Sequence, residues 1–254
     1  QAIWNTPRSH RGWKVNAGRY ARSSTGGGQW QNKSMPQRWT VAYKDLTFNI
    51  KPMNFKHTGL FPEQAVNWDW MSGIVSARTA RHESTAVLNL FAYTGGATMA
   101  CAKAGATVCH VDAAKGMTQW ARENAALCKL PETSVRWIVD DCLKFVRREI
   151  KRGNKYDGIV MDPPSYGRGP GGEVWKLEDC AFDLVNEAAQ LLSDHPAFFL
   201  FNGYTTGLQP AVLKNLLDFA VCSRFGGHAE AEEVCLPAQA GGVLPCGASG
   251  RWTP

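Results

Sequence analysis

The chain has 254 residues, is 44% hydrophobic and carries a formal net charge of +6. This length allows one sizeable core with a small appended module, and no run approaches the roughly 18 uninterrupted apolar residues of a membrane helix. The eight cysteines stand singly, without Cys-x-x-Cys or Cys/His zinc spacing, and the first residues show no signal-peptide core. We therefore expect a cytoplasmic protein with reduced thiols, no membrane contact and no metal.

The positive charge is concentrated in residues 1–60, which hold ten lysines and arginines against a single acid, Asp45. Six aromatic residues are interleaved with these cations before residue 45, and this combination suits phosphate neutralisation together with base stacking. A solvated basic arm and an Arg/Ser-rich organelle transit segment are the alternatives, although cleavable transit segments rarely carry so many tryptophans. Residues 1–60 are therefore predicted to bind nucleic acid.

The remainder of the N-terminal part contains three recognisable segments. Residues 1–36 show no sustained hydrophobic period, whereas residues 38–52 alternate apolar and polar side chains on both sides of a turn, which predicts a β-hairpin. An amphipathic helix is expected to begin near Pro62 and to continue toward Arg78. Residues 59–64 are too polar for a core loop and too specific for a linker, so we expect them to contact a ligand.

Residues 86–112 are the centre of a predicted second domain at 61–254. An apolar run at 86–91 is followed by a Gly-Gly turn, a helix of small residues and a second apolar run that ends at Asp112. Strand, glycine turn, helix, strand and terminal carboxylate in this order indicate a nucleotide-binding βαβ unit.

Apolar strands continue to alternate with helices in the rest of the domain. The expected elements are helices at 115–129, 143–152, 177–192 and 209–222 and strands at 135–139, 156–161, 197–201, 231–236 and 243–249. This alternation predicts an α/β fold with a doubly wound, mostly parallel sheet. The Gly-rich stretch at 166–176 is interpreted as a mobile substrate lid, with a structureless loop as the alternative.

Polar residues follow the strands of this sheet, at the edge where ligands of such folds bind. They are Tyr93, Thr94, Gly95 and Gly96 after the first strand, Asp112 after the second, Asp140 and Asp141 after the third, Asp162 after the fourth, and Asn202, Tyr204 and Thr205 after the fifth. A single acid after a strand is more often a helix N-cap than a ligand contact. Four successive strands that end in acid or glycine favour a binding site for the set as a whole.

The chemistry of these strand ends indicates the ligand. The turn at Gly95 and Gly96 lacks the full G-x-G-x-x-G pattern that admits a pyrophosphate, and it suits a smaller group such as an amino-acid carboxylate. Asp112 can accept both hydroxyls of a ribose, and a third-strand acid such as Asp141 can accept from an adenine amino group. Amino acid, ribose and adenine together describe S-adenosylmethionine.

The runs Leu-Phe-Ala-Tyr-Thr-Gly-Gly at 90–96, Val-Asp at 111–112, Asp-Asp-Cys at 140–142 and Asp-Pro-Pro at 162–164 resemble the class I S-adenosylmethionine-dependent methyltransferases. Within them the chain is most similar, over residues 39–254, to bacterial large-subunit ribosomal RNA methyltransferases of the cytosine-C5 and guanine-N7 types. The resemblance implies a Rossmann-like seven-stranded sheet in the order 3-2-1-4-5-7-6, with the last strand antiparallel. It also implies S-adenosyl-L-methionine as cofactor and RNA, ribosomal RNA first, as partner.

The candidate site residues combine this resemblance with the strand ends. Candidate cofactor contacts are Phe61, Glu63 and Gln64 in a covering segment at 58–64, and Tyr93, Thr94, Gly95, Gly96, Asp112, Asp140, Asp141 and Asp162. Candidate catalytic residues are Asp162, Pro163, Pro164, Tyr166 and Asn202.

The Asp162-Pro163-Pro164 corner bears on the acceptor. Proline carbonyls without competing neighbouring N–H donors can accept from a base amino group while an aromatic ring stacks on the base. Ser165 stands between Pro164 and Tyr166, so the aromatic residue does not directly follow the prolines. This spacing weakens the specificity for an exocyclic amine. Asp162 accepts a proton or orients the base, with a purely structural role in the turn as the alternative.

One departure from the cytosine-C5 type concerns the nucleophile. Those enzymes attack the base with a cysteine thiolate after the fifth strand, where this chain has Asn202, Gly203 and Tyr204. Methylation of C5 is therefore doubtful, because without covalent attack that ring carbon is a poor nucleophile. The asparagine is more similar to the guanine-N7 type, in which a ring nitrogen attacks the methyl group directly.

The predicted function is S-adenosylmethionine-dependent methylation of a base in RNA, with residues 1–60 holding the RNA. A protein or small-molecule methyltransferase, and an RNA-binding module with a vestigial cofactor pocket, are the alternatives. A second basic cluster lies on the helix at 143–152 and just beyond it, and it either extends the RNA track or is a solvated helix face.

Overall fold

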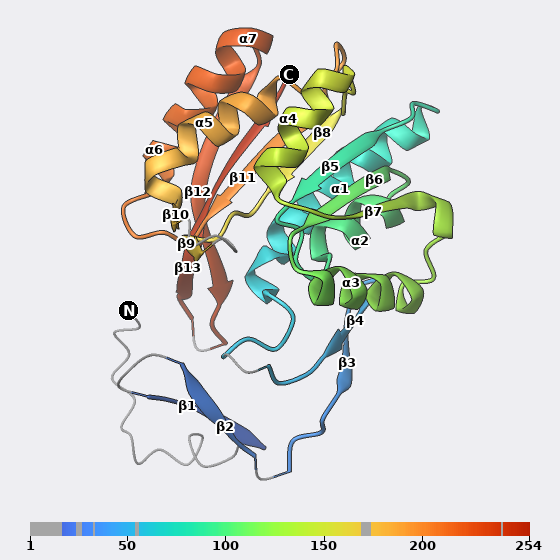
Figure 1. Cartoon of the computed structure of the whole chain (residues 1–254). Coiled ribbons are helices and arrows are strands. Elements are labelled where there is room, and N and C mark those ends of the chain that lie inside the picture. Colours follow the sequence, from blue (N-terminus) through green and yellow to red (C-terminus); the bar gives the residue numbers. More distant parts are fainter. Residues whose placement is uncertain (1–16, 24–26, 33, 54–55, 169–173, 240) are drawn as a thin grey trace. The chain divides into compact units, whose positions relative to one another are not determined.

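The structure, a computed structural model, describes residues 17–23, 27–32, 34–53, 56–168, 174–239 and 241–254 (Figure 1). Contacts divide the chain into a first unit, Gln1–Phe61, and a second unit, Pro62–Pro254. Within the described ranges, no helix is both long enough and apolar enough to cross a membrane. The tip of the predicted lid, at 169–173, lies outside the described residues.

The first unit contains two antiparallel hairpins, drawn in blue in Figure 1. Their strands are β1 (Gly18–Arg22) with β2 (Gly28–Asn32), and β3 (Trp39–Tyr43) with β4 (Leu46–Ile50). The β3-β4 pair confirms the hairpin predicted at 38–52. The β1-β2 pair, in which the rings of Tyr20 and Trp30 lie 5.4 Å apart, has no fully buried side chain on β1. Sequence periodicity therefore missed this hairpin, because without a buried face there is no alternation to detect.

The second unit is built on a seven-stranded sheet in the order β12-β13-β11-β8-β5-β6-β7. Its strands are β5 (Ala86–Leu90), β6 (Thr107–Asp112), β7 (Val135–Val139), β8 (Gly158–Met161), β11 (Phe198–Gly203), β12 (His228–Pro237) and β13 (Val243–Thr253). Neighbouring strands from β7 to β11 are parallel, whereas β13 runs antiparallel to both β11 and β12. The doubly wound sheet, its strand order and its antiparallel last strand are thus confirmed.

Helices connect these strands and cover both faces of the sheet (Figure 1). They are α1 (Ala65–Ala80), α2 (Gly96–Lys103), α3 (Lys115–Leu127), α4 (Cys142–Arg152), α5 (Leu177–Ala189), α6 (Pro210–Leu217) and α7 (Ser223–Phe225). A 3-10 turn at Pro62–Gln64 precedes α1, another at Glu132–Ser134 precedes β7, and a π-helical turn at Asp218–Cys222 follows α6. The helix predicted at 209–222 therefore consists of an α-helical segment, α6, and the π-helical turn.

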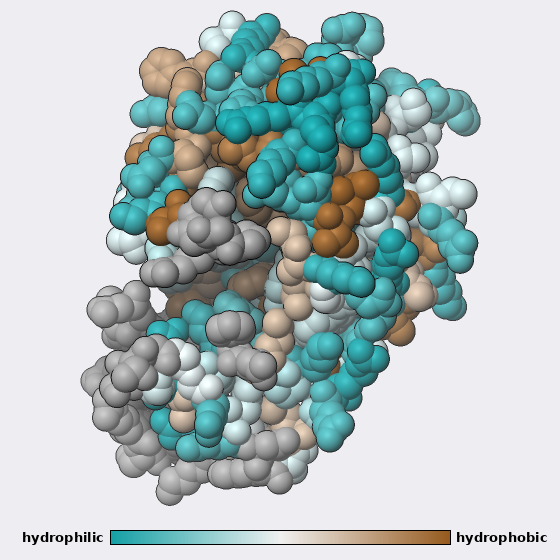
Figure 2. Space-filling view, viewed as in Figure 1, coloured by the Kyte–Doolittle hydropathy of each residue, from teal (hydrophilic) through white to brown (hydrophobic). Residues whose placement is uncertain are grey.

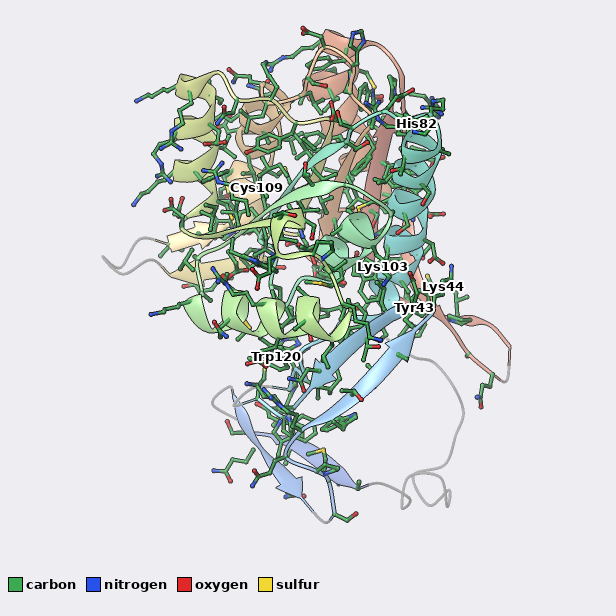
Figure 3. All side chains as sticks on the ribbon, turned by 90° about the vertical axis from the view of Figure 1, so that its right-hand side faces the viewer. Tyr43, Lys44, His82, Lys103, Cys109 and Trp120 are labelled. Atoms are coloured by element: carbon green, nitrogen blue, oxygen red, sulfur yellow. The ribbon has the colours of Figure 1, made fainter. Side chains whose placement is uncertain are left out.

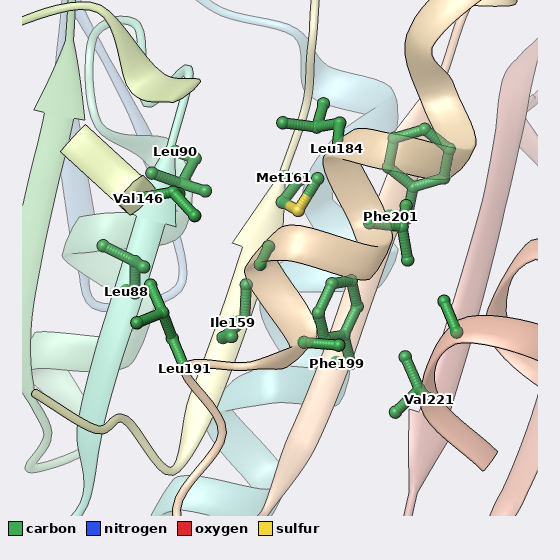
Figure 4. Packing of buried hydrophobic residues seen from close by; sticks show 14 of the residues in the cluster. Leu88, Leu90, Val146, Ile159, Met161, Leu184, Leu191, Phe199, Phe201 and Val221 are labelled. Atoms are coloured by element: carbon green, nitrogen blue, oxygen red, sulfur yellow. The ribbon is translucent and has the colours of Figure 1, made fainter. Parts of the chain in front are cut away.

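The main core lies between one face of the sheet and α4, α5 and α6 (Figure 4). Leu88, Ile159 and Phe199 point from three neighbouring strands into this layer, where Leu184 of α5 is also buried. The opposite face is covered by α1, α2 and α3, and Trp120 of α3 is only 1% exposed there (Figure 3). Because both faces are covered, the strands read as nearly continuous apolar runs.

Candidate active site

The candidate site lies where β5, β6, β8 and β11 end, since parallel strands bring their carboxyl ends to one edge of the sheet. The turn after β5 has an unusual backbone, with φ angles of 55° at Phe91, 50° at Tyr93 and 86° at Gly95. A Cβ at Gly95 would lie 2.8 Å from Met99 Cε, and one at Gly96 would lie 2.6 Å from Trp68 Cζ2. Only glycines allow this turn to lie so close to α1 and α2.

The turn delivers the chain into the first turn of α2 without a side-chain cap. The N–H groups at this helix start are consequently oriented toward the strand-end edge with no capping side chain, which suits a carboxylate ligand. Asn124 Nδ2 of α3 donates to the Thr94 carbonyl at 2.9 Å and holds the turn from the other side.

Asp112 connects this turn to the end of β6. Its Oδ2 accepts from the backbone N–H of Tyr93 and its Oδ1 from that of Ala114, both at 2.8 Å. Burial raises the pKa of Asp112, while the two N–H donors partly offset that rise. A carboxylate oxygen has a second lone pair, so Asp112 can hold the loop and still accept ligand hydroxyls.

The two acids after β7 have structural partners. Asp141 Oδ1 accepts from Lys144 N at 2.8 Å and caps α4, which is the N-cap geometry that strand-end acids commonly adopt. Asp140 accepts from Asp141 N at 2.9 Å and forms an ion pair with Arg148. Each carboxylate keeps acceptor capacity beyond these contacts.

Cys142, the last residue of the Asp-Asp-Cys run at 140–142, has contacts in the site that the sequence did not predict. Its Sγ accepts from Phe91 N at 3.2 Å and donates to the Val111 carbonyl at 3.7 Å, so it ties the β5 turn to the end of β6. Burial raises the pKa of this thiol well above its ordinary value, which keeps it protonated and unreactive. Only the fold reveals this role, because Phe91 and Val111, the partners of the thiol, are distant from it in the chain.

Asp162 follows β8 and faces Asn202 at the end of β11. Asn202 Nδ2 donates to Asp162 Oδ1 at 2.8 Å, and the asparagine is completely buried. Burial raises the pKa of Asp162 to about 6; the Asn202 N–H opposes this rise and the negative charge of Glu63 adds to it. A carboxylate in this range is mostly ionised at neutral pH and can still take a proton.

The segment after Asp162 differs from the expected arrangement in one contact. The Pro164 carbonyl accepts from Trp175 Nε1 at 2.7 Å, so one of the two proline carbonyls expected to meet a base is already engaged. The Trp175 ring lies 5.9 Å from that of Phe91. Its strand, β10 (Val174–Lys176), pairs antiparallel with β9 (Tyr166–Arg168), so the described part of the Gly-rich stretch is a short hairpin.

A cavity of about 330 Å³ opens beside this hairpin. The described residues that line it are Ser165, Tyr166, Lys176, Glu178, Tyr204, Thr205 and Thr206, none of them a cysteine. Tyr166 is 52% exposed, and Thr205 Oγ1 is buried without a hydrogen-bond partner among the described residues. The cavity thus joins a half-exposed aromatic side chain, a buried hydroxyl without a partner among the described residues, and charges of both signs.

Glu63 and Gln64 reach the same region from the start of α1. Gln64 Nε2 donates to Tyr204 Oη at 2.8 Å, and Tyr204 Oη donates to Glu63 Oε1 at 3.1 Å. Phe61 belongs to the first unit, where its ring lies 5.1 Å from that of His57. The fold therefore brings Glu63 and Gln64 to the fifth-strand end, while the part of Phe61 in ligand binding stays a prediction.

The basic cluster on and after α4 is largely engaged within its own unit. Arg147 pairs with Glu187, Arg148 with Asp140 and Arg152 with Glu149. The surface over α4 is predominantly hydrophilic (Figure 2). These pairs favour the interpretation as a solvated helix face over an RNA track.

Comparison with known proteins places these features in a family context. A family model described as "S-adenosylmethionine-dependent methyltransferase" matches residues 4–176. The chain is 32% identical to the SAM-dependent methyltransferase from Agrobacterium tumefaciens, with a TM-score of 0.88 over 96% of this chain and 79% of that one. A putative SAM-dependent methyltransferase from Streptococcus mutans, 17% identical over 96% of this chain and 63% of that one, shares the fold with a TM-score of 0.76.

Curated relatives match over shorter regions. The ribosomal RNA large subunit methyltransferase K/L of Colwellia psychrerythraea is 30% identical over 159 residues, which cover 62% of this chain and 20% of that protein. The ribosomal RNA large subunit methyltransferase I of Tolumonas auensis is 41% identical over 114 residues, which cover 42% of this chain and 29% of that protein. The matched regions thus span less than a third of these relatives.

Proposed function

The chain belongs to the S-adenosylmethionine-dependent methyltransferases, and we propose that it transfers the methyl group of this cofactor to a nitrogen atom of a base in RNA, with ribosomal RNA as the first candidate. Two curated relatives are named as ribosomal RNA large subunit methyltransferases. The concentration of cations and aromatic rings in residues 1–60 supports an RNA partner as well. We place the enzyme in the cytoplasm.

The residues at the strand ends fit the cofactor. We assign its methionine carboxylate to the uncapped start of α2 at Gly96, its ribose hydroxyls to Asp112 and its adenine to Asp140 and Asp141. Glu63 and Gln64 lie near the reacting end. The donor set supports this order, since helix N–H groups suit a carboxylate and carboxylates suit hydroxyl and amino groups.

The contact between Asp162 and Asn202 is the observation on which the nitrogen acceptor rests. S-adenosylmethionine supplies an electrophilic methyl group, so the protein has to align an acceptor atom in line with it and exclude water. Asp162 is placed to orient the acceptor base, and it can also take a proton from it, because the pKa of this carboxyl is raised to about 6. No cysteine lines the described part of the adjoining cavity, and this disfavours covalent attack on a ring carbon.

The cavity beside Tyr166 is our candidate for the base pocket. We assign stacking on the base to Tyr166, which is 52% exposed, and a hydrogen bond to the base to the Thr205 hydroxyl, which has no partner among the described residues. The β9-β10 hairpin borders this cavity through Lys176, so movement of the hairpin would open and close it.

Incubation of the protein with radiolabelled S-adenosylmethionine tests the proposed function. Separate reactions contain total RNA, purified ribosomal subunits and an RNase-treated extract, and we expect label to enter RNA only. Nuclease digestion and mass spectrometry of labelled RNA should then identify an N-methylated base. Label confined to protein or small molecules would overturn the RNA proposal, and 5-methylcytosine would overturn the nitrogen acceptor.

A further inference from the structure

A series of hydrogen bonds among buried side chains connects Arg251 on β13 to Asp162. Arg251 on β13 donates from Nε at 3.0 Å and from Nη2 at 2.7 Å to Asn67 Oδ1, and Asn67 Nδ2 donates to Ser249 Oγ at 2.8 Å. Ser249 Oγ then donates to Asn202 Oδ1 at 2.7 Å. Asn67, Ser249 and Asn202 are each completely buried.

Donor and acceptor roles can be followed along this series of hydrogen bonds from Arg251 to Asp162. A guanidinium only donates, so the atom of Asn67 that meets Arg251 must be its oxygen, and its nitrogen must therefore face Ser249. The Ser249 oxygen accepts from Asn67, and its single hydrogen is donated to Asn202 Oδ1. The Asn202 nitrogen consequently has to face Asp162.

A second branch leaves the same asparagine. Asn67 Nδ2 also donates to Gln64 Oε1 at 2.8 Å. This fixes the Gln64 amide so that its nitrogen donates to Tyr204, whose hydroxyl hydrogen is left for Glu63. Both branches thus begin at Arg251 and end on a carboxylate at the reacting end of the site.

We propose that Arg251, Asn67 and Ser249 are positioning residues that lock the amide of Asn202 with its nitrogen toward Asp162 and thereby keep Asp162 Oδ1 a hydrogen-bond acceptor. A proton received from the methylated group then has to reside on Asp162 Oδ2, because Oδ1 already faces an N–H. This inference rests on the proposed function only in placing the acceptor at Asp162. The lock itself is a property of the free protein.

Removal of the Ser249 hydroxyl tests the lock without changing charge. In Ser249→Ala the Asn202 oxygen loses its donor and the amide can rotate, so Asp162 keeps its N–H contact for only part of the time. We expect the pKa of Asp162, followed by carbon-13 NMR of the carboxyl groups, to rise by roughly 0.5–1 unit. The other polar groups that face Asp162, Glu63 from the turn before α1 and Tyr204 from the segment after β11, are unchanged.

The kinetic readout separates positioning from a merely structural role. We expect Ser249→Ala to lower kcat by about tenfold with an unchanged KM for S-adenosylmethionine, and to move the acidic limb of the pH profile to higher pH. Ser249→Thr retains the hydroxyl, so the acidic limb of its pH profile and its Asp162 pKa should both match those of the wild type. The side-chain amide protons of Asn202 should exchange with water more quickly in Ser249→Ala than in the wild type.

The matched control is Ser193→Ala, which removes a hydroxyl that donates to Asp157 Oδ1 at 2.7 Å at the opposite end of β8. It should leave the Asp162 pKa and kcat unchanged. An Asp162 pKa and an Asn202 exchange rate that stay at wild-type values in Ser249→Ala would overturn the lock. If the wild-type protein labels no RNA, the proposed function is wrong. The NMR titration of Asp162 still tests whether Ser249 holds the Asn202 amide in place.

Discussion

Asp162 is the residue at which activity and stability conflict. Its carboxyl has a pKa of about 6 in the folded chain, above the ordinary 3.8, because it is buried. A raised folded pKa means that the neutral form favours folding, and this contribution is lost as pH rises from about 4 through 6. At neutral pH the site therefore contains an ionised carboxylate whose burial lowers the stability of the folded state.

Asp162→Asn should therefore inactivate the enzyme and stabilise it at the same time. Without cofactor, we expect the free energy of unfolding to rise by about 2 kcal/mol at pH 8 and to change little at pH 4. Urea denaturation at the two pH values measures this. The control Asp157→Asn, at the other end of β8, alters a carboxylate that accepts from Ala86 N and should lose stability at pH 8. Equal stability of Asp162→Asn and wild type at both pH values would contradict the burial argument.

Asp112 is the residue on which cofactor affinity should depend most directly. Loss of two hydroxyl contacts to a carboxylate in Asp112→Ala is expected to weaken S-adenosylmethionine binding by at least about 100-fold, measured by isothermal titration calorimetry. RNA affinity should be retained. Asp157→Ala is the control, because it also removes a carboxylate that holds a backbone N–H but lies at the opposite end of the sheet. Unchanged cofactor affinity in Asp112→Ala would remove Asp112 from the site.

At the scale of elements, the β5 turn depends on the absence of side chains. In Gly96→Ala the new methyl group would lie 2.6 Å from Trp68 Cζ2, so α2 has to shift away from α1. We expect a loss of about 1–3 kcal/mol in the free energy of unfolding and weaker cofactor binding. In Gly73→Ala, on α1, the methyl group meets nothing within 4 Å, and this control should gain roughly 0.5–1 kcal/mol. Similar thermal midpoints for the two variants would refute the packing argument.

The indole N–H of Trp175 connects the β9-β10 hairpin to the Asp162 corner. Trp175→Phe keeps a ring beside Phe91 and removes the bond to the Pro164 carbonyl. We expect kcat/KM for RNA to fall by about three- to tenfold, which matches one lost hydrogen bond, with an unchanged dissociation constant for S-adenosylmethionine. Steady-state kinetics with RNA as the varied substrate measure this. A weaker cofactor affinity instead would mean that the hairpin belongs to the cofactor side.

At the scale of the whole molecule, the asymmetry of charge should appear in the salt dependence of RNA binding. Each cation that neutralises a phosphate steepens the fall of affinity with salt. Residues 1–36 hold six lysines and arginines, so their removal should flatten the slope of log K against log salt by as much as about 4. Filter binding at several salt concentrations measures the slope.

A matched pair of full-length variants locates this effect. Replacement of Arg19 and Arg22, both exposed on β1, by glutamine should reduce the slope by roughly 1.4. The same replacement of Lys144 and Lys151, both exposed on α4, should leave it nearly unchanged, since we interpret that helix face as solvated. A larger effect from the α4 pair would move the RNA contact to the second unit.

The nucleotide-type unit at 86–112 was predictable because its signals are local. Two apolar runs, a Gly-Gly turn between them and an acid at the end are contiguous in the chain, and β5, α2 and β6 follow that pattern closely. The strand order came instead from family resemblance, because periodicity does not state which strands are neighbours. The β1-β2 hairpin was missed, since its side chains are not buried on one face.

By itself, then, the sequence determined the chemistry at each strand end: which positions carry carboxylates, glycines and an asparagine in place of a thiol. Only the tertiary structure decided which of these groups meet. The Asn67 contacts to Ser249 and Arg251 span 182 and 184 positions of the chain, and Trp175 reaches the Pro164 carbonyl across a hairpin. Such pairings depend on how strands and loops pack, and a local pattern of residues carries no information about partners that distant in the chain.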